Sequence, residues 1–219
     1  MSWTGSFFNQ KGVCCIFHHI PKCGGTSVLS ALKKWFTVIR EYRDGDAYPN
    51  LLKLEILTSE HCICGHYELD GYYLHQRYPE IFNKREHRVF TFVRDPLELK
   101  VSLHYYEKRR GTVNGRSLDE TLLTRKNFLS ARFPCTEDNY REVIDRYFFV
   151  GITEHAQESM DDLAYLLGKR RIQLGHENQS KRDSCYENLS PALIEKFKNE
   201  NKLDYLIYNY CCKRRRLTL

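Results

Sequence analysis

Short apolar runs alternate with amphipathic stretches along this chain of 219 residues. Three of the runs have the length and composition of buried strands, and they cover residues 13–17, 88–93 and 147–152. Residues at helical spacing follow them, so strands and helices are expected to alternate along the chain. This alternation predicts an α/β fold. We find no repeat and no linker, and a hydrophobic content of 42% suffices for one core, so residues 1–219 are predicted to form a single domain.

Several predicted helices have clear boundary signals. Asp95 is expected to cap a helix that starts at Pro96, and Thr153 is expected to cap the helix after the third run. The stretch from Ser117 to Glu120 has the spacing of a capping box, and Gly168 is a natural helix end. These signals place loops directly after the second and third strands.

The loop after the first strand has the composition of an anion site. It contains Lys22 and two glycines, Gly24 and Gly25, and a helical pattern begins directly afterwards. The first N–H groups of a helix have no partner within the helix, and glycine carries no Cβ that would block an approaching ligand. Thr26 and Ser27 add hydroxyl donors. The loop therefore predicts a site for phosphate or sulfate.

The order of residues in this loop distinguishes between classes of phosphate-binding protein. A nucleoside-triphosphate P-loop has its lysine after the glycines, whereas Lys22 comes before them. A nucleotide kinase is therefore the weaker interpretation, and it would require metal-dependent turnover of ATP.

A second basic residue ends the second strand. Arg94 follows the apolar run 88–93, and its forked guanidinium suits a phosphate. Ligands of open α/β sheets bind outside the carboxyl ends of the strands, so Arg94 and Lys22 are expected to face one crevice if their strands are near neighbours. Ser102 lies about two turns into the following helix and could approach the same anion.

Together the two segments resemble a known family. Pro-Lys-Cys-Gly-Gly-Thr-Ser at residues 21–27 resembles the 5′-phosphosulfate loop of sulfotransferases that use 3′-phosphoadenosine 5′-phosphosulfate (PAPS). Arg-Asp-Pro at residues 94–96, with Ser102 eight residues after the arginine, is similar to their 3′-phosphate site. Within the family, the chain looks most like the heparan sulfate 2-O-sulfotransferases and their bacterial relatives. The resemblance implies a three-layer, P-loop-like fold with a central, mainly parallel sheet flanked by helices.

The resemblance also implies the residues that bind the donor. It assigns the phosphosulfate to Lys22, Cys23, Gly24, Gly25, Thr26 and Ser27, and the 3′-phosphate to Arg94 and Ser102. Lys181, in a polar stretch before the last helices, is an additional candidate for a phosphate contact. Many relatives have threonine where this chain has Cys23, which leads to the hypothesis that alkylation of that thiol blocks cofactor binding.

The resemblance places the catalytic base in the segment His-Cys-Ile-Cys-Gly-His at residues 61–66, where a Gly-His pair identifies His66. His61 and Glu68 are the alternatives. A zinc site is disfavoured, because the cysteines lack the usual Cys-x-x-Cys spacing and a second pair.

These assignments imply a reaction without a metal. His66 would accept the proton of an acceptor hydroxyl, while Lys22 would stabilise the negative charge that develops on the departing phosphate. The product of the donor would be 3′-phosphoadenosine 5′-phosphate (PAP). The acceptor is expected to be a hydroxyl of a small molecule or carbohydrate, with an amine as the less favoured option.

Whole-chain properties leave one further alternative. The formal net charge of +6 suits a polyanionic ligand, although Lys213 to Arg216 contribute to it from what reads as a solvated basic tail at residues 213–219. A noncatalytic protein that binds polyanions or nucleic acid would explain the charge but not the order of the motifs. Without an export signal or a long apolar segment, and with nine cysteines, the chain is expected to have no membrane anchor and to reside in the cytoplasm with reduced thiols.

Overall fold

The computed structural model describes residues 11–45, 47–83, 86–113, 115–175 and 189–218. At its centre is a five-stranded sheet in the order β2-β3-β1-β4-β5, in which every pair of neighbouring strands is parallel. The strands are β1 (Cys15–His18), β2 (Thr37–Glu41), β3 (His61–Gly65), β4 (Arg88–Val93) and β5 (Phe149–Ile152). The predicted α/β fold with a parallel sheet is confirmed.

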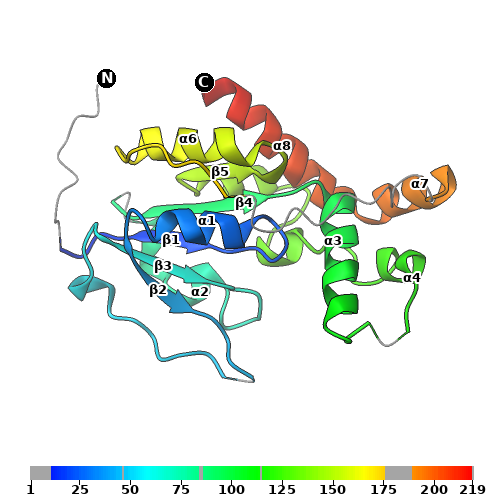
Figure 1. Ribbon diagram of the computed structural model, residues 1–219, viewed down its shortest axis with the longest axis horizontal. Helices are drawn as coiled ribbons and strands as arrows, with labels where there is room; N and C mark the ends of the chain where they lie inside the picture. The colour runs from blue at the N-terminus through cyan, green and yellow to red at the C-terminus, as the bar shows by residue number, and fades with distance from the viewer. Residues whose placement is uncertain (1–10, 46, 84–85, 114, 176–188, 219) are drawn as a thin grey trace.

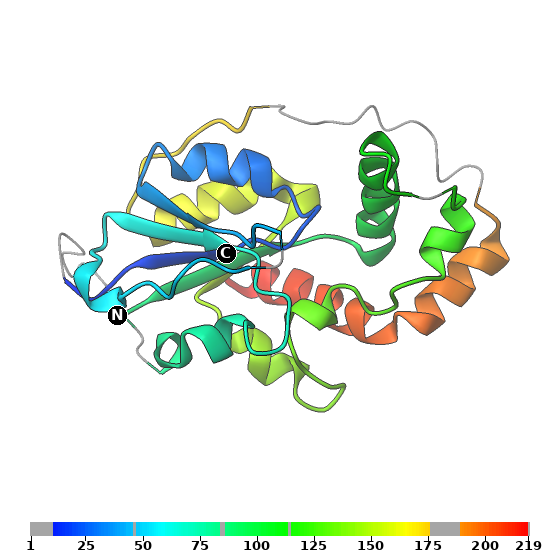
Figure 2. The ribbon, with the colours of Figure 1, turned by 90° about the horizontal axis from the view of Figure 1, so that it is seen from below.

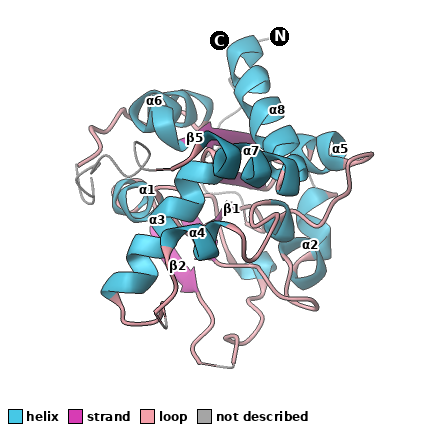
Figure 3. Ribbon diagram, turned by 90° about the vertical axis from the view of Figure 1, so that its right-hand side faces the viewer, coloured by secondary structure: helices cyan, strands magenta, loops and turns pink. Residues whose placement is uncertain are grey.

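Helices cover both faces of the sheet. They are α1 (Gly25–Leu32), α2 (Leu74–Arg77), α3 (Pro96–Arg109), α4 (Leu118–Leu122), α5 (Tyr140–Asp145), α6 (Ala156–Leu166), α7 (Pro191–Glu200) and α8 (Lys202–Thr218). Short 3₁₀ turns span Leu54–Ile56, Pro79–Phe82, Ser130–Arg132 and Thr153–His155. Helices α1 and α6 lie on one face, and α2, α5 and α8 lie on the other (Figures 1 and 2). The remaining helices α3, α4 and α7 stand beyond the carboxyl ends of the strands and are nearest to the viewer in Figure 3.

The central strand β1 is buried on both faces, because Ile16 and Phe17 are both inaccessible to solvent. Phe17 stacks on Phe90 of β4 with ring centroids 5.4 Å apart. In register, His18 lies beside Gly65 of β3 and Thr91 of β4. The loops that follow β1, β3 and β4 therefore all leave the sheet on the side where the carboxyl ends of the strands lie.

The three strands predicted from apolar runs are present, and the run 88–93 coincides with β4. The sequence analysis missed β2, because this strand is at the edge of the sheet and its residues are mostly exposed or half-buried. An exposed edge strand has no continuous apolar run that would identify it.

Several boundaries can be compared with the prediction. Asp95 caps α3 by accepting hydrogen bonds from the backbone N–H groups of Leu97 (2.9 Å) and Glu98 (3.1 Å), as expected. The capping box of Ser117 and Glu120 is also present. Thr153 does not cap the next helix. Its hydroxyl instead donates to the Val93 carbonyl oxygen at 2.8 Å, and α6 begins only after a 3₁₀ turn.

The basic end of the chain differs from the prediction. Residues 213–218 continue α8, and the side chains of Arg214 and Arg215 are half-buried. Arg214 donates hydrogen bonds to the carbonyl oxygens of Ile144 (3.0 Å) and Tyr147 (2.9 Å), and Arg215 pairs with Asp162 at 3.2 Å. These two arginines connect α8 to distant segments of the domain. The carbonyl and carboxylate groups that they contact partly neutralise their charge.

The cysteines of the described segments are not joined in disulfides. In the same segments we find no helix whose length and hydropathy would allow it to span a membrane.

Candidate functional site

The loop between β1 and α1 has an unusual backbone. Lys22 and Gly24 both have positive φ angles, 67° and 73°. A left-handed conformation costs a non-glycine residue about 1–2 kcal/mol, so Lys22 is held there by its surroundings. Gly24 is the N-cap of α1, and no side chain caps that helix end. The first N–H groups of α1 therefore remain available to an anion.

The other residues of the loop differ in exposure. Thr26 is exposed and Ser27 is half-buried, so both hydroxyls are near solvent in the first turn of α1. Cys23 is fully buried, and burial raises the pKa of its thiol far above the usual value. Any contact of residue 23 with a ligand must come from its backbone, and alkylation of Cys23 is not a suitable probe of the site.

Arg94 follows β4 and meets the Lys22 loop. Its Nη1 donates a hydrogen bond to the Lys22 carbonyl oxygen at 3.3 Å, and its Nη2 pairs with Glu98 at 2.9 Å. The two residues are 72 positions apart in the sequence and come together because β1 and β4 are neighbours in the sheet. The predicted convergence of the two basic segments is thus present in the structure.

Helix α3 presents one face to this loop. The ammonium group of Lys22 lies 4.3 Å from the centroid of the Tyr106 ring. Glu98, Ser102 and Tyr106 are four residues apart and share that face of α3. Ser102, which is half-buried, therefore faces the Lys22 loop, as the sequence analysis expected.

Positive charges are crowded at this point. The pKa of Lys22 is lowered, first by burial and then by the charges of Arg109 and Arg94. Repulsion of this kind falls when a phosphate or sulfate enters between the cations. The residues present therefore fit a bound dianion.

His66 lies on the other side of β1, directly after β3. Its ring centroid is 4.5 Å from that of His19 and 4.7 Å from that of Tyr42. Burial lowers the pKa of His66, the charge of Arg132 lowers it further, and Glu68 acts in the opposite direction. The imidazole is therefore neutral at pH 7 and can accept a proton.

The two alternative bases occupy different positions. His61 is at the amino end of β3, about 13 Å of extended chain from Gly65, and its Nδ1 accepts a hydrogen bond from the Thr58 backbone N–H. It therefore lies at the amino ends of the strands, whereas the Lys22 loop lies at their carboxyl ends. Glu68 is near His66 but forms an ion pair with Arg132 at 2.9 Å. Across the described residues, no group of three or more His, Cys, Asp or Glu side chains could hold a metal ion.

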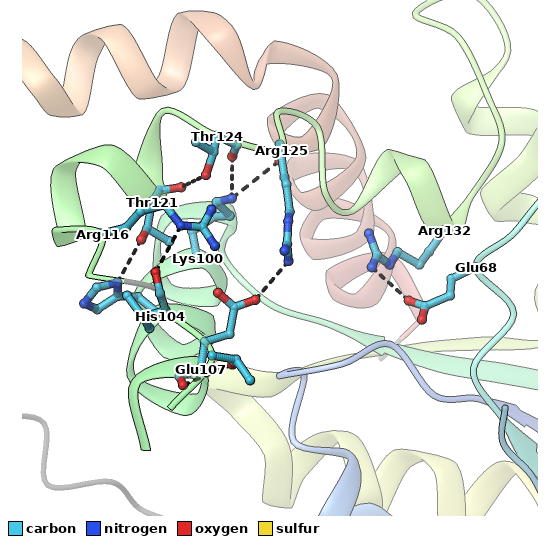
Figure 4. A network of polar contacts seen from close by, with 11 residues as sticks. Glu68, Lys100, His104, Glu107, Arg116, Thr121, Thr124, Arg125 and Arg132 are labelled. Carbon is cyan, nitrogen blue, oxygen red and sulfur yellow. Dashed lines mark hydrogen bonds and ion pairs between the residues drawn. The ribbon is translucent and has the colours of Figure 1, made fainter. Parts of the chain in front are cut away.

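A polar network connects α3 to residues 121–125 (Figure 4). Lys100 is buried and donates to the Thr124 carbonyl oxygen at 2.6 Å, and burial lowers its pKa to about 8. Glu107 pairs with Arg125 at 2.9 Å. These contacts join α3, which carries Tyr106 and Ser102, to the segment that follows α4.

The sequence analysis missed three side chains of this site: His19, Tyr42 and Arg132. His19 lies two residues before the quoted segment 21–27, and its position directly before Ile-Pro-Lys was the available signal. Tyr42 follows the unrecognised strand β2, and Arg132 lies in a poorly patterned segment, so neither had a signal. Lys181 lies outside the described residues.

No protein-family model matches the sequence, and no curated protein matches it. Solved structures do match the fold. A sulfotransferase from Alicyclobacillus acidocaldarius superimposes with a TM-score of 0.53 at 13% identity, over 91% of this chain and 94% of that one. The mouse sulfotransferase SULT7A1 in complex with PAP superimposes with a TM-score of 0.53 at 9% identity, over 93% of this chain and 91% of that one.

These likenesses establish the fold class. The central parallel sheet flanked by helices is the fold of the two sulfotransferases, as the sequence analysis expected. At 13% and 9% identity the comparison concerns the fold alone. The likeness to the heparan sulfate 2-O-sulfotransferases stays a prediction.

Proposed function

We propose that this protein is a sulfotransferase that moves a sulfuryl group from PAPS to the hydroxyl of a small molecule or carbohydrate. The observation that carries the proposal is the contact between Arg94 and the Lys22 loop. It joins a helix N-terminus and two cations that follow the neighbouring strands β1 and β4, at the carboxyl ends of the strands where α/β proteins bind ligands.

The two basic groups have separate roles in this proposal. Lys22 and the first turn of α1 bind the 5′-phosphosulfate, and Arg94 with Ser102 binds the 3′-phosphate. The guanidinium suits a phosphate that stays unchanged during the reaction, whereas the single charge of Lys22 suits the oxygen that gains charge. The presence of PAP in the mouse SULT7A1 structure supports this choice of donor.

In the transfer step, the acceptor oxygen forms a bond to sulfur while the bond between sulfur and the bridging phosphate oxygen breaks. His66 accepts the acceptor proton, and the phosphate leaves with the electron pair as PAP. A positioned base contributes about 100- to 10,000-fold to such a step. The lowered pKa of His66 keeps it in the form that can accept the proton.

A binding experiment separates this proposal from the polyanion-binding alternative. Calorimetry should detect PAP binding in the micromolar range and weaker binding of ATP, which has no 3′-phosphate. A protein that binds DNA but not PAP, and releases the DNA when salt is raised, would instead be a nucleic-acid-binding protein.

A transfer experiment then tests the activity. Incubation with ³⁵S-labelled PAPS and a panel of hydroxyl and amine acceptors should yield a labelled product. His66→Ala should lower the rate by about 100-fold or more, while His61→Ala, at the other end of β3, serves as the matched control. Equal rates in the wild type and His66→Ala would remove His66 from the mechanism.

A further inference from the structure

Three side chains connect three neighbouring strands at the carboxyl edge of the sheet. The Tyr42 hydroxyl oxygen lies 3.0 Å from Cys64 Sγ and 3.1 Å from His19 Nδ1. Cys64 belongs to β3, Tyr42 follows β2, and His19 follows β1. The contacts from Cys64 to Tyr42 and from Tyr42 to His19 therefore form a series that leads from the interior of the sheet to the loop that contains Lys22.

The far nitrogen of His19 touches the start of α1. A Cβ added to Gly25 would lie 1.7 Å from His19 Nε2, so the imidazole occupies the space that a side chain at position 25 would need. The ring also stacks on Phe17 with centroids 5.4 Å apart. Packing and the Tyr42 contact thus fix both the position and the orientation of the imidazole.

We assign the hydrogen of the His19 imidazole from the relative strength of the hydrogen-bond acceptors beside Tyr42. A hydroxyl has one proton, and an imidazole nitrogen accepts it far better than a thiol sulfur does. In the arrangement that this favours, Tyr42 donates to His19 Nδ1, and the Cys64 thiol donates to the Tyr42 oxygen. Burial raises the pKa of Cys64 to about 11, so the thiol keeps its proton at neutral pH.

His19 itself is uncharged at neutral pH. Burial, together with the charges of His66 and Lys22, lowers its pKa to about 3. A neutral imidazole whose Nδ1 accepts a hydrogen bond carries its hydrogen on Nε2.

We propose that His19 Nε2–H donates a hydrogen bond to an oxygen of the 5′-phosphate or phosphosulfate group bound at the start of α1. This inference rests on the proposed function. A neutral donor at this position binds the anion without adding another positive charge beside Lys22, Arg94 and Arg109. Tyr42 and Cys64 are positioning residues, because they act by stabilising the Nε2–H tautomer of His19.

Ligands with and without a 5′-phosphate test the proposal by calorimetry. His19→Phe keeps a ring of similar size but removes the donor. It should weaken the binding of PAP about 10- to 100-fold, the effect of one hydrogen bond to a charged group. Binding of adenosine 3′-phosphate, which has no 5′-phosphate, should not change. His61→Phe, at the opposite edge of the sheet, is the matched control and should bind both ligands as the wild type does.

Unchanged PAP binding by His19→Phe, or equal losses for the two ligands, would overturn the role of His19. Wild-type protein that fails to bind PAP would overturn the proposed function and this inference together. The two failures are distinguishable, because the wild-type titration is measured separately.

The tautomer can be measured without any ligand. Long-range ¹H–¹⁵N spectra of the wild type should show His19 as the neutral Nε2–H tautomer, and Tyr42→Phe should convert it into a mixture of both tautomers. A change of this kind would not follow from a purely structural role of Tyr42. An Nδ1–H tautomer in the wild type would contradict the proposal, even if His19→Phe does not fold.

Discussion

The guanidinium of Arg94 donates a hydrogen bond to the Lys22 carbonyl oxygen at 3.3 Å, although the two residues follow different strands and are 72 positions apart. The contact places two cations at neighbouring strand ends. It also supplies a partner for the carbonyl of a residue with a left-handed backbone.

The proposed roles of these two cations predict different ligand dependences. Arg94→Gln should weaken PAP binding about 10- to 100-fold and leave binding of adenosine 5′-phosphate unchanged, because only PAP has a 3′-phosphate. Lys22→Met should weaken the binding of both ligands. Titration calorimetry of each variant with each ligand measures the pattern, and an equal effect of Arg94→Gln on both ligands would contradict it.

The pH dependence of transfer should respond to the neighbours of His66. Because its pKa is lowered, the base stays deprotonated below pH 6.5, and the rate should fall only at more acidic pH. Arg132→Gln removes a charge that lowers this pKa, so the acidic limb of the rate profile should move to higher pH. Glu68→Gln should move it to lower pH. Shifts of the two variants in the same direction would contradict the assignment.

Acid should destabilise the protein through its buried histidines. Burial lowers the pKa of His18 and of His19 from 6.5 to about 3, so the unfolded chain binds protons that the folded protein does not. Their stabilising effect is complete above pH 6.5 and is lost as the pH falls toward 3, by about 1.4 kcal/mol per pH unit for each histidine. Urea unfolding at several pH values measures this slope.

A pair of variants assigns part of that slope to His18, whose Nδ1 lies 2.8 Å from the Tyr147 hydroxyl. The double variant His18→Phe/Tyr147→Phe should have a smaller slope than the wild type, by about 1.4 kcal/mol per pH unit. Tyr147→Phe alone keeps the buried imidazole and should retain the wild-type slope. Equal slopes in all three proteins would exclude His18 as a source of the acid sensitivity.

The contact between Gly25 and His19 predicts a packing effect. In Gly25→Ala, the new Cβ would lie 1.7 Å from His19 Nε2, and the ring is confined by Phe17 and Tyr42. The variant should lose about 1–3 kcal/mol of unfolding free energy. Adding His19→Ala makes room for the methyl group, so in chemical denaturation the double variant should be more stable than the sum of the two single effects predicts.

Glu41 should be among the most sensitive positions for stability. This buried carboxylate ends β2 and accepts hydrogen bonds from the hydroxyls of Tyr67 (2.8 Å) and Tyr78 (2.6 Å) and from Arg77 Nε (2.8 Å). Glu41→Ala leaves the Arg77 charge without its carboxylate and should cost about 3–5 kcal/mol in chemical denaturation. Tyr67→Phe removes only one of the hydrogen bonds and should cost about 1 kcal/mol.

Sequence reasoning predicted much of the site because its main elements have local signals. The Lys22 loop and the Arg94 segment each follow an apolar run, and the composition of each indicates an anion. The predicted convergence needed only that β1 and β4 be near neighbours, which they are. For the basic end of the chain the local signal was misleading, because Arg214 and Arg215 bind carbonyl and carboxylate groups of distant segments.

By itself, the sequence determined the strands β1, β4 and β5, the caps of α3 and α4, and the composition of the Lys22 loop. These features depend on residues close together in the chain, where hydrophobic spacing and capping chemistry act directly. Only the tertiary structure decided that His19, Tyr42 and His66 share one cluster. Their rings meet because β2, β3 and β1 lie side by side, and the order of strands depends on contacts between segments that the local pattern does not encode.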